Sequence, residues 1–136
     1  MPKNLKPSQM VPWVRERADR AFSVFLQKQQ GAYSAAAPVA TGRLASSFRI
    51  GRAQPDLSVE PPREGPEGVT LKEYSGRITM DGTWHCSNWL PYAWRTAYDA
   101  KWSKGGRQGG AAWYTTVLSQ RRAKLDEEWK REFSGQ

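Results

Sequence analysis

The fold is decided first by residues 10–30, which read MVPWVRERADRAFSVFLQKQQ. Apolar residues recur in this stretch every three or four positions, the spacing that places side chains on one face of an α-helix. They are Val11, Val14, Ala18, Ala21, Phe22 and Phe25. Pro12 suits the first turn of a helix, where its missing N–H costs no hydrogen bond, and Gly31 suits the position just after the last turn. The stretch therefore predicts a long amphipathic helix that ends at Gly31.

A second long helix is predicted near the other end of the chain, over residues 111–133. Its inner stripe is predicted to consist of Val117, Leu118, Arg121, Leu125, Trp129 and Phe133. Charged residues between these positions, such as Lys124 and Glu127, would lie mostly outside.

Between the helices, short stretches that alternate apolar and polar residues predict strands over residues 47–53, 69–75, 77–80 and 83–87. In the first of them, Phe48 and Ile50 would share one face and Arg49 the other. The dipeptide Asp81-Gly82 suits a tight hairpin between the last two strands. Residues 90–98 fit either a short helix or an extended segment. The predicted fold class is α+β, with a long N-terminal helix, a small antiparallel β-sheet with long loops, and a long C-terminal helix.

The length of 136 residues suits a single domain over residues 1–136, with residues 1–9 as an N-terminal tail. Two loops interrupt it. Residues 54–68 hold four prolines and two glycines, and a loop of about 15 residues is long for a compact domain. It is either an arm that reaches a neighbouring molecule or an excursion without a partner. Residues 103–110 form a Gly-rich loop that contains the sequence GGRQGG.

The charge of the chain is concentrated in its first part. Residues 1–52 carry nine basic and two acidic side chains, so +7 of the net charge of +8 lies there. Such a block suits a polyanion or an acidic protein surface, although a solvated helix face would also carry it. The candidate contacts to DNA or to an acidic partner are Arg15, Arg17, Arg20, Arg43, Arg49 and Arg52. No apolar stretch is long enough to cross a membrane or to form a secretion signal, so no membrane partner is expected.

Residues suited to catalysis or metal binding are scarce. One histidine, His85, and one cysteine, Cys86, supply neither a disulfide nor the usual ligand set of a structural zinc site. The two residues would point to opposite faces of a strand. GGRQGG lacks the spacing of known phosphate-binding loops, and the carboxylates at 126–128 and 132 suit a solvated helix. We expect no enzyme activity and no cofactor.

Aromatic side chains crowd the second half of the chain, where they suit core packing and a subunit interface better than base stacking. They are Trp84, Trp89, Tyr92, Trp94, Tyr98, Trp102, Trp113 and Tyr114.

Two segments carry a resemblance to a known family. Residues 37–47 read APVATGRLASS, in which Gly42 permits a tight turn, Thr41 caps it and Leu44 fills the core. Residues 88–93 read NWLPYA. Together they resemble the P-V-x-T-G-x-L-x-x-S and N-x-x-P-Y-A segments of the tail-completion, or minor tail, family of tailed bacteriophages. The matching residues are Pro38, Thr41, Gly42, Leu44, Ser47, Asn88, Pro91, Tyr92 and Ala93.

The resemblance implies a structural virion protein of the head-tail junction. Such a subunit forms a homo-oligomeric ring, commonly a hexamer, between the portal-adaptor complex and the tail tube or tail terminator. It leaves a channel for the packaged DNA, and it occupies the host cytoplasm during assembly. The alternatives from the residues themselves are a small basic nucleic-acid-binding module and, less in keeping with the composition, a small enzyme or toxin.

Overall fold

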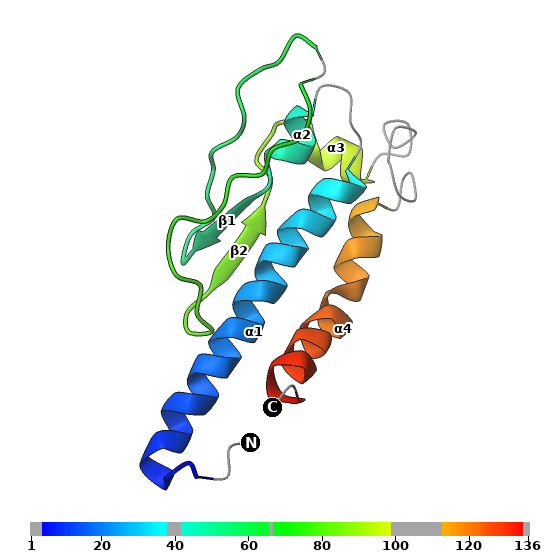
Figure 1. The fold of residues 1–136 in the computed structure, drawn as a ribbon. Coiled ribbons are helices and arrows are strands. Elements are labelled where there is room, and N and C mark those ends of the chain that lie inside the picture. Colours follow the sequence, from blue (N-terminus) through cyan, green and yellow to red (C-terminus); the bar gives the residue numbers. More distant parts are fainter. Residues whose placement is uncertain (1–3, 38–41, 66, 99–112, 135–136) are drawn as a thin grey trace.

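The computed structural model describes residues 4–37, 42–65, 67–98 and 113–134 and confirms the α+β class (Figure 1). Two long helices, two short helices and a two-stranded antiparallel sheet make up the described parts. The helices are α1 (Pro7–Ala36), α2 (Arg43–Ser46), α3 (Ala93–Tyr98) and α4 (Trp113–Ser134), and the strands are β1 (Arg49–Arg52) and β2 (Trp84–Ser87). Residues 90–98 fit either a short helix or an extended segment by sequence, and they end in the short helix α3.

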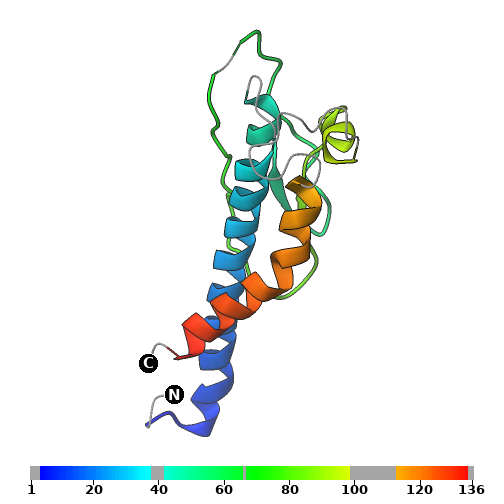
Figure 2. The same ribbon diagram turned by 90° about the vertical axis from the view of Figure 1, so that its right-hand side faces the viewer.

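Helix α1 lies between the other layers. The β-sheet and the extended segments around it lie on one side of α1, and α4 runs antiparallel to α1 on the other (Figures 1 and 2). The described part of the molecule is therefore an elongated pair of helices with the sheet against one side.

The start of α1 differs from the prediction. The helix begins at Pro7, so residues 7–9 belong to it and not to a tail. Pro7 occupies the first turn, where a proline needs no hydrogen-bond acceptor. Pro12 lies inside the helix, although it was expected in the first turn.

The end of α1 also differs, because the helix passes through Gly31 and continues to Ala36. Tyr33 and Ala36 are buried, and their packing holds the additional turn in place. The chain leaves the helix at Ala37, whose backbone is extended with ψ 148°. The next residue is Pro38, and a residue before proline is driven out of the helical region.

The sheet is smaller than predicted. Residues 69–75 and 77–80 are not strands, and the predicted hairpin at Asp81-Gly82 is wrong because β2 pairs with β1. In this antiparallel ladder Ile50 lies opposite Cys86. The amide Nε2 of Gln30 donates to the Phe48 carbonyl at 2.8 Å and to the Lys72 carbonyl at 3.1 Å. In a sheet, the Lys72 carbonyl would accept a hydrogen bond from a neighbouring strand. Here the Gln30 side chain of α1 supplies that hydrogen bond instead.

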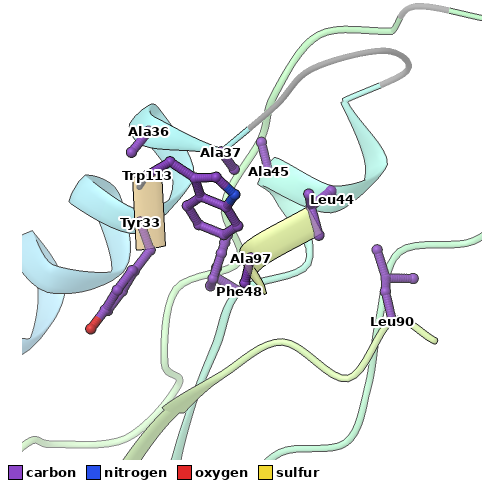
Figure 3. Close-up of a cluster of buried hydrophobic side chains, with 9 residues drawn as sticks. All are labelled: Tyr33, Ala36, Ala37, Leu44, Ala45, Phe48, Leu90, Ala97 and Trp113. Atoms are coloured by element: carbon purple, nitrogen blue, oxygen red, sulfur yellow. The ribbon is translucent and has the colours of Figure 1, made fainter. Parts of the chain in front are cut away.

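The core consists of two clusters, and β1 with the residue before it contributes one side chain to each. Phe48 packs in the larger cluster beside the ends of α1 and α4, and Ile50 packs in the smaller one with Leu26 and Ile78. Figure 3 shows the larger cluster, in which Trp113 is 2% exposed and donates its indole N–H to the Thr96 carbonyl at 2.8 Å. Phe48 and Ile50, which the sequence places on one face of a strand, are both buried in the core.

The inner stripe predicted for α4 is only partly right. Val117 packs against the larger cluster, but Trp129 is 40% exposed and Arg121 is exposed. Glu128, which the pattern placed outside, is buried. The reason is that the matching face of α1 carries cations there, so the contact between the two helices is partly ionic.

Candidate interaction surface

The two motif segments meet through Asn88. Its amide nitrogen donates to the Leu44 carbonyl at 2.8 Å, and its amide oxygen accepts the Leu90 N–H at 3.2 Å. Leu44 and Leu90 are buried in the same cluster, and Ala93 packs against it. Segments far apart in the sequence thus form one structural junction.

Gly42 is required by its backbone geometry. Its φ angle is +85°, and a Cβ atom there would lie 2.1 Å from the Gly68 carbonyl oxygen. The expected tight turn at Gly42 is therefore confirmed, as is the buried position of Leu44. Pro38 and Thr41 lie outside the described residues.

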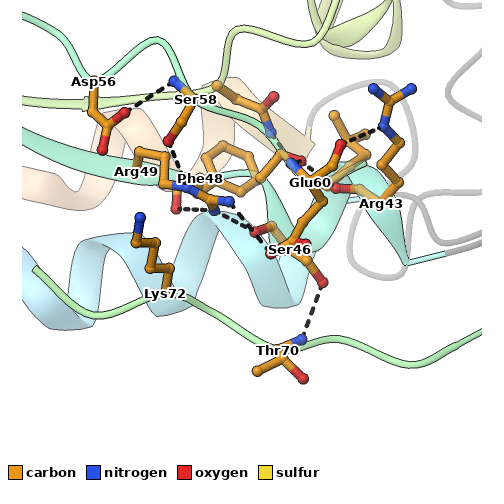
Figure 4. A network of polar contacts seen from close by, with 12 residues as sticks. Arg43, Ser46, Phe48, Arg49, Asp56, Ser58, Glu60, Thr70 and Lys72 are labelled. Atoms are coloured by element: carbon orange, nitrogen blue, oxygen red, sulfur yellow. Dashed lines mark hydrogen bonds and ion pairs between the residues drawn. The ribbon is translucent and has the colours of Figure 1, made fainter. Parts of the chain in front are cut away.

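The serines of the first motif attach the long loop to the body of the protein (Figure 4). The Oγ of Ser47 accepts the Glu60 N–H at 3.0 Å and donates to the Arg43 carbonyl at 2.6 Å. The Oγ of Ser46 accepts the Thr70 N–H at 3.0 Å. Glu60 within the loop and Thr70 just after it are thereby held by Ser46, the last residue of α2, and by Ser47, which follows it.

Arg49 is the buried centre of the same network. Its guanidinium donates to the Ser46 carbonyl at 2.6 Å and to the Ser58 hydroxyl at 3.2 Å, and it lies 3.3 Å from the Glu60 carboxylate. The face of β1 that strand alternation directs outward is covered by the loop, which buries Arg49 to 4% exposure. Arg49 was expected to contact DNA or an acidic partner, and this burial corrects that expectation.

Ser58 also fixes the start of the loop. Hydrogen bonds from the Ser58 hydroxyl and N–H hold the pKa of Asp56 below its ordinary value. At the tip, Arg63 donates to the Gly68 carbonyl at 2.7 Å. The loop is extended, as predicted, and polar contacts hold its base against the body of the protein.

The remaining candidate arginines differ in the contacts that they make with the rest of the chain. Arg43 donates to the Glu60 carbonyl at 2.8 Å. Arg52 lies 3.2 Å from the Asp81 carboxylate, and its guanidinium lies over the Trp84 ring at 5.5 Å. A hydrogen bond from Thr79 holds the pKa of Asp81 below its ordinary value.

Arg17 and Arg20 face α4, where they lie 3.3 and 3.5 Å from the Glu132 carboxylate. Further along α1, Lys28 donates to Glu128 at 2.6 Å, and Arg131 reaches the same carboxylate at 2.7 Å. The Lys28 hydrogen bond, followed by that of Arg131, holds the pKa of Glu128 below its ordinary value. Part of the basic block is therefore used to join the two helices.

Arg15 differs from the others because it is exposed and forms no hydrogen bond or ion pair with another described residue. It lies beside an open groove of about 1440 Å³ between α1 and residues 77–81. The apolar lining of this groove includes Met10, Val11, Val14 and Met80, which are 38%, 64%, 40% and 45% exposed. We call it the α1 groove.

A second hollow of about 470 Å³ adjoins the motif junction. It is lined mainly by apolar and aromatic side chains, among them Phe48, Leu90 and Trp113. Trp89 at its rim is 52% exposed, and the motif residues Pro91 and Tyr92 are also exposed. Of the aromatic group, Trp113 and Tyr114 pack in the core, whereas the side chains of Trp94 and Tyr98 and all of Trp102 lie outside the described parts.

His85 and Cys86 are both partly buried in β2. Cys86 packs against both clusters, and burial raises the pKa of its thiol to about 12. Within the described ranges, no group of three or more His, Cys, Asp or Glu residues is arranged to hold a metal ion. None of the helices described has the length and apolar character needed to span a membrane. The predicted loop at 103–110 and its Arg107 lie outside the described residues.

Sequence reasoning missed the residues that join distant segments: Gln30, Asn88 as a bridge to Leu44, and Glu128. A buried amide or carboxylate leaves no periodic signal, so nothing in the spacing could have found them. No protein-family model, curated protein or solved structure matches this chain.

Proposed function

We propose that the chain is a structural subunit of the head-tail junction of a tailed bacteriophage, which forms a ring between the portal-adaptor complex and the tail. The observation that carries the proposal is the hydrogen bond from Asn88 to the Leu44 carbonyl. It supports the resemblance because both motif segments act together, as parts of one junction, rather than as unrelated short matches.

The exposed apolar surface also favours a role in assembly. The α1 groove and the rim at Trp89 and Tyr92 leave large apolar side chains in solvent on two separate regions of the molecule. Contiguous apolar patches on a protein surface mark contacts with other proteins. A ring subunit needs several such contacts, with its sister copies, with the adaptor and with the tail tube or terminator.

In this proposal the work of the chain is mechanical. The elongated helix pair and the attached loop provide fixed surfaces that position neighbouring rings around a DNA channel. Exposed cations such as Arg15 would meet either DNA phosphates or acidic neighbours.

The test is a phage in which the gene carries an early stop codon. We expect filled heads and separate tails that do not join, with infectivity restored by the wild-type chain supplied from a plasmid. An epitope tag on the supplied chain should be labelled by gold at the neck in electron micrographs. Normal infectious particles without the chain would contradict the proposal.

A small basic nucleic-acid-binding module is the second candidate, and the net charge of +8 favours it. Arg17, Arg20 and Arg52 form ion pairs and Arg49 is buried, so few of the candidate arginines are available to phosphates. Binding of a short DNA duplex is measured by fluorescence anisotropy at low and physiological salt. Micromolar binding that survives physiological salt and drops when Arg15, Arg17 and Arg20 are replaced would favour this second function.

A further inference from the structure

The α1 groove has the features of a surface that receives a helix. Met10 and Val14 are spaced by four residues and Val11 and Val14 by three, so they share one face of α1. On an amphipathic helix such a face ordinarily packs against another element. Here no described segment covers it, because Met10, Val11 and Val14 retain between 38% and 64% exposure.

The charged residues of the groove indicate what charge a bound helix should carry. Each of its three carboxylates already has a partner: Glu16 pairs with Arg20 at 2.6 Å, Asp19 accepts the Met80 N–H at 2.9 Å, and Asp81 pairs with Arg52 at 3.2 Å. The three acids and the arginines that pair with two of them, Arg20 and Arg52, carry a net charge of −1. Arg15 and Arg77 complete the groove.

Arg15 and Arg77 are the two cations that line the groove. Both are exposed, and neither forms a hydrogen bond or ion pair with the rest of the described chain. With them the groove and its pairing arginines carry a net charge of +1, and two guanidinium groups remain as donors. Guanidinium groups bind carboxylates with paired hydrogen bonds, so the complementary surface is apolar and acidic.

We propose that the α1 groove binds an amphipathic helix of another protein, whose apolar face covers Val11, Val14 and Met80 and whose carboxylates pair with Arg15 and Arg77. Of the neighbours of a ring subunit, an acidic protein matches these two arginines better than a second copy of this chain, whose net charge is +8. The proposal rests on the proposed function in that it describes how the subunit holds an acidic neighbour.

The experiment uses the full chain and a synthetic peptide of roughly 15 residues, long enough for about four helical turns. The peptide places Leu on one face and Glu on the other, and a matched peptide has Lys in place of Glu. We expect the Leu/Glu peptide to bind, as measured by fluorescence anisotropy, at least about tenfold more tightly than the Leu/Lys peptide.

Two variants locate the binding. Val11→Asp should weaken binding of the Leu/Glu peptide by at least about tenfold, since it places a carboxylate among the apolar contacts. Val24→Asp is the matched control, because Val24 is a 38% exposed valine of α1 that does not line the groove. The double variant Arg15→Glu/Arg77→Glu should reverse the preference toward the Leu/Lys peptide. Circular dichroism establishes that each variant keeps its helical content.

Equal binding of both peptides, equal effects of Val11→Asp and Val24→Asp, or no binding of the Leu/Glu peptide would overturn the proposal. Self-association that is lost in Val11→Asp but kept in Val24→Asp would also overturn it and assign the groove to a second copy. These outcomes are independent of the phage experiment, in which a requirement for the chain at the neck can stand even if the groove binds nothing acidic.

Discussion

Lys28 of α1 donates a hydrogen bond of 2.6 Å to Glu128 of α4, across the contact between the two long helices. The Glu128 side chain is 7% exposed, whereas that of Lys28 is 59% exposed. Solvent can therefore approach the cation but hardly the anion. The contact between these helices thus depends on a buried carboxylate at a position where periodicity predicts a solvated one.

Replacing Glu128 with Gln should lower the free energy of unfolding by about 1–2 kcal/mol, because Lys28 and Arg131 lose a charged acceptor. The change is measured by urea denaturation. Glu127→Gln is the control: Glu127 is exposed and lies 3.7 Å from Lys124, so its loss should cost less than about 0.5 kcal/mol. Equal stability of the two variants would show that the buried pair contributes nothing.

The contribution of Glu128 should depend on pH in a defined direction. Its pKa in the folded protein lies below the ordinary value of 4.5, so the unfolded chain takes up a proton first as the pH falls. The stabilisation is complete above pH 4.5 and is lost as the pH falls through the lower folded pKa. The difference in stability between the wild type and Glu128→Gln should therefore shrink below that pH, and a difference that grows in acid would contradict the assignment.

Gly42→Ala should destabilise the protein by about 2–4 kcal/mol, because Gly42 has a positive φ angle and its new Cβ would collide with the Gly68 carbonyl. Gly31→Ala tests the opposite effect. Nothing lies within 4 Å of a Cβ at Gly31, which is inside α1, so alanine should stabilise the protein by about 0.5–1 kcal/mol. Thermal denaturation of both variants checks the two signs.

Asn88→Ala should lower the free energy of unfolding by about 1–3 kcal/mol, since the Leu44 carbonyl loses its amide donor and the Leu90 N–H loses its acceptor. Asn4→Ala, at an exposed position near the N-terminus, serves as the control and should have little effect. If the two variants unfold at the same urea concentration, the junction of the motif segments does not contribute to stability.

The Cys86 thiol should resist alkylation in the folded protein. Its pKa is raised to about 12 by burial, so almost no thiolate is present at pH 8. Iodoacetamide labelling followed by mass spectrometry should show modification only after unfolding in urea. Rapid labelling of the native chain would show that β2 opens readily.

The sequence predicted most of what depends on local spacing. The two long helices, β2 and the apolar positions Phe48 and Ile50 follow from apolar periodicity. The strands predicted at 69–75 and 77–80 failed because their alternation is a local signal, whereas a strand also needs a partner edge. Gln30 of α1 occupies part of that edge instead.

The candidate site was predicted only in part, for a similar reason. Gly42 and Leu44 could be recognised because a turn and a core position show in the neighbouring residues. Arg49 and Glu128 could not, because a charged side chain in a short strand or long helix looks the same whether it is solvated or buried. Only the arrangement of the loop over β1 and of α4 against α1 distinguishes the two cases.

The amino-acid sequence by itself determined the α+β class, the two long helices and the concentration of positive charge in the first part of the chain, because backbone sterics and side-chain periodicity act between near neighbours. Tertiary structure alone decided which arginines are buried or paired, how Asn88 joins the two motif segments and why Arg15 stays open beside the α1 groove. Those outcomes depend on residues brought together across long sequence separations, where each polar group takes whichever partner the packing of the helices and sheet supplies.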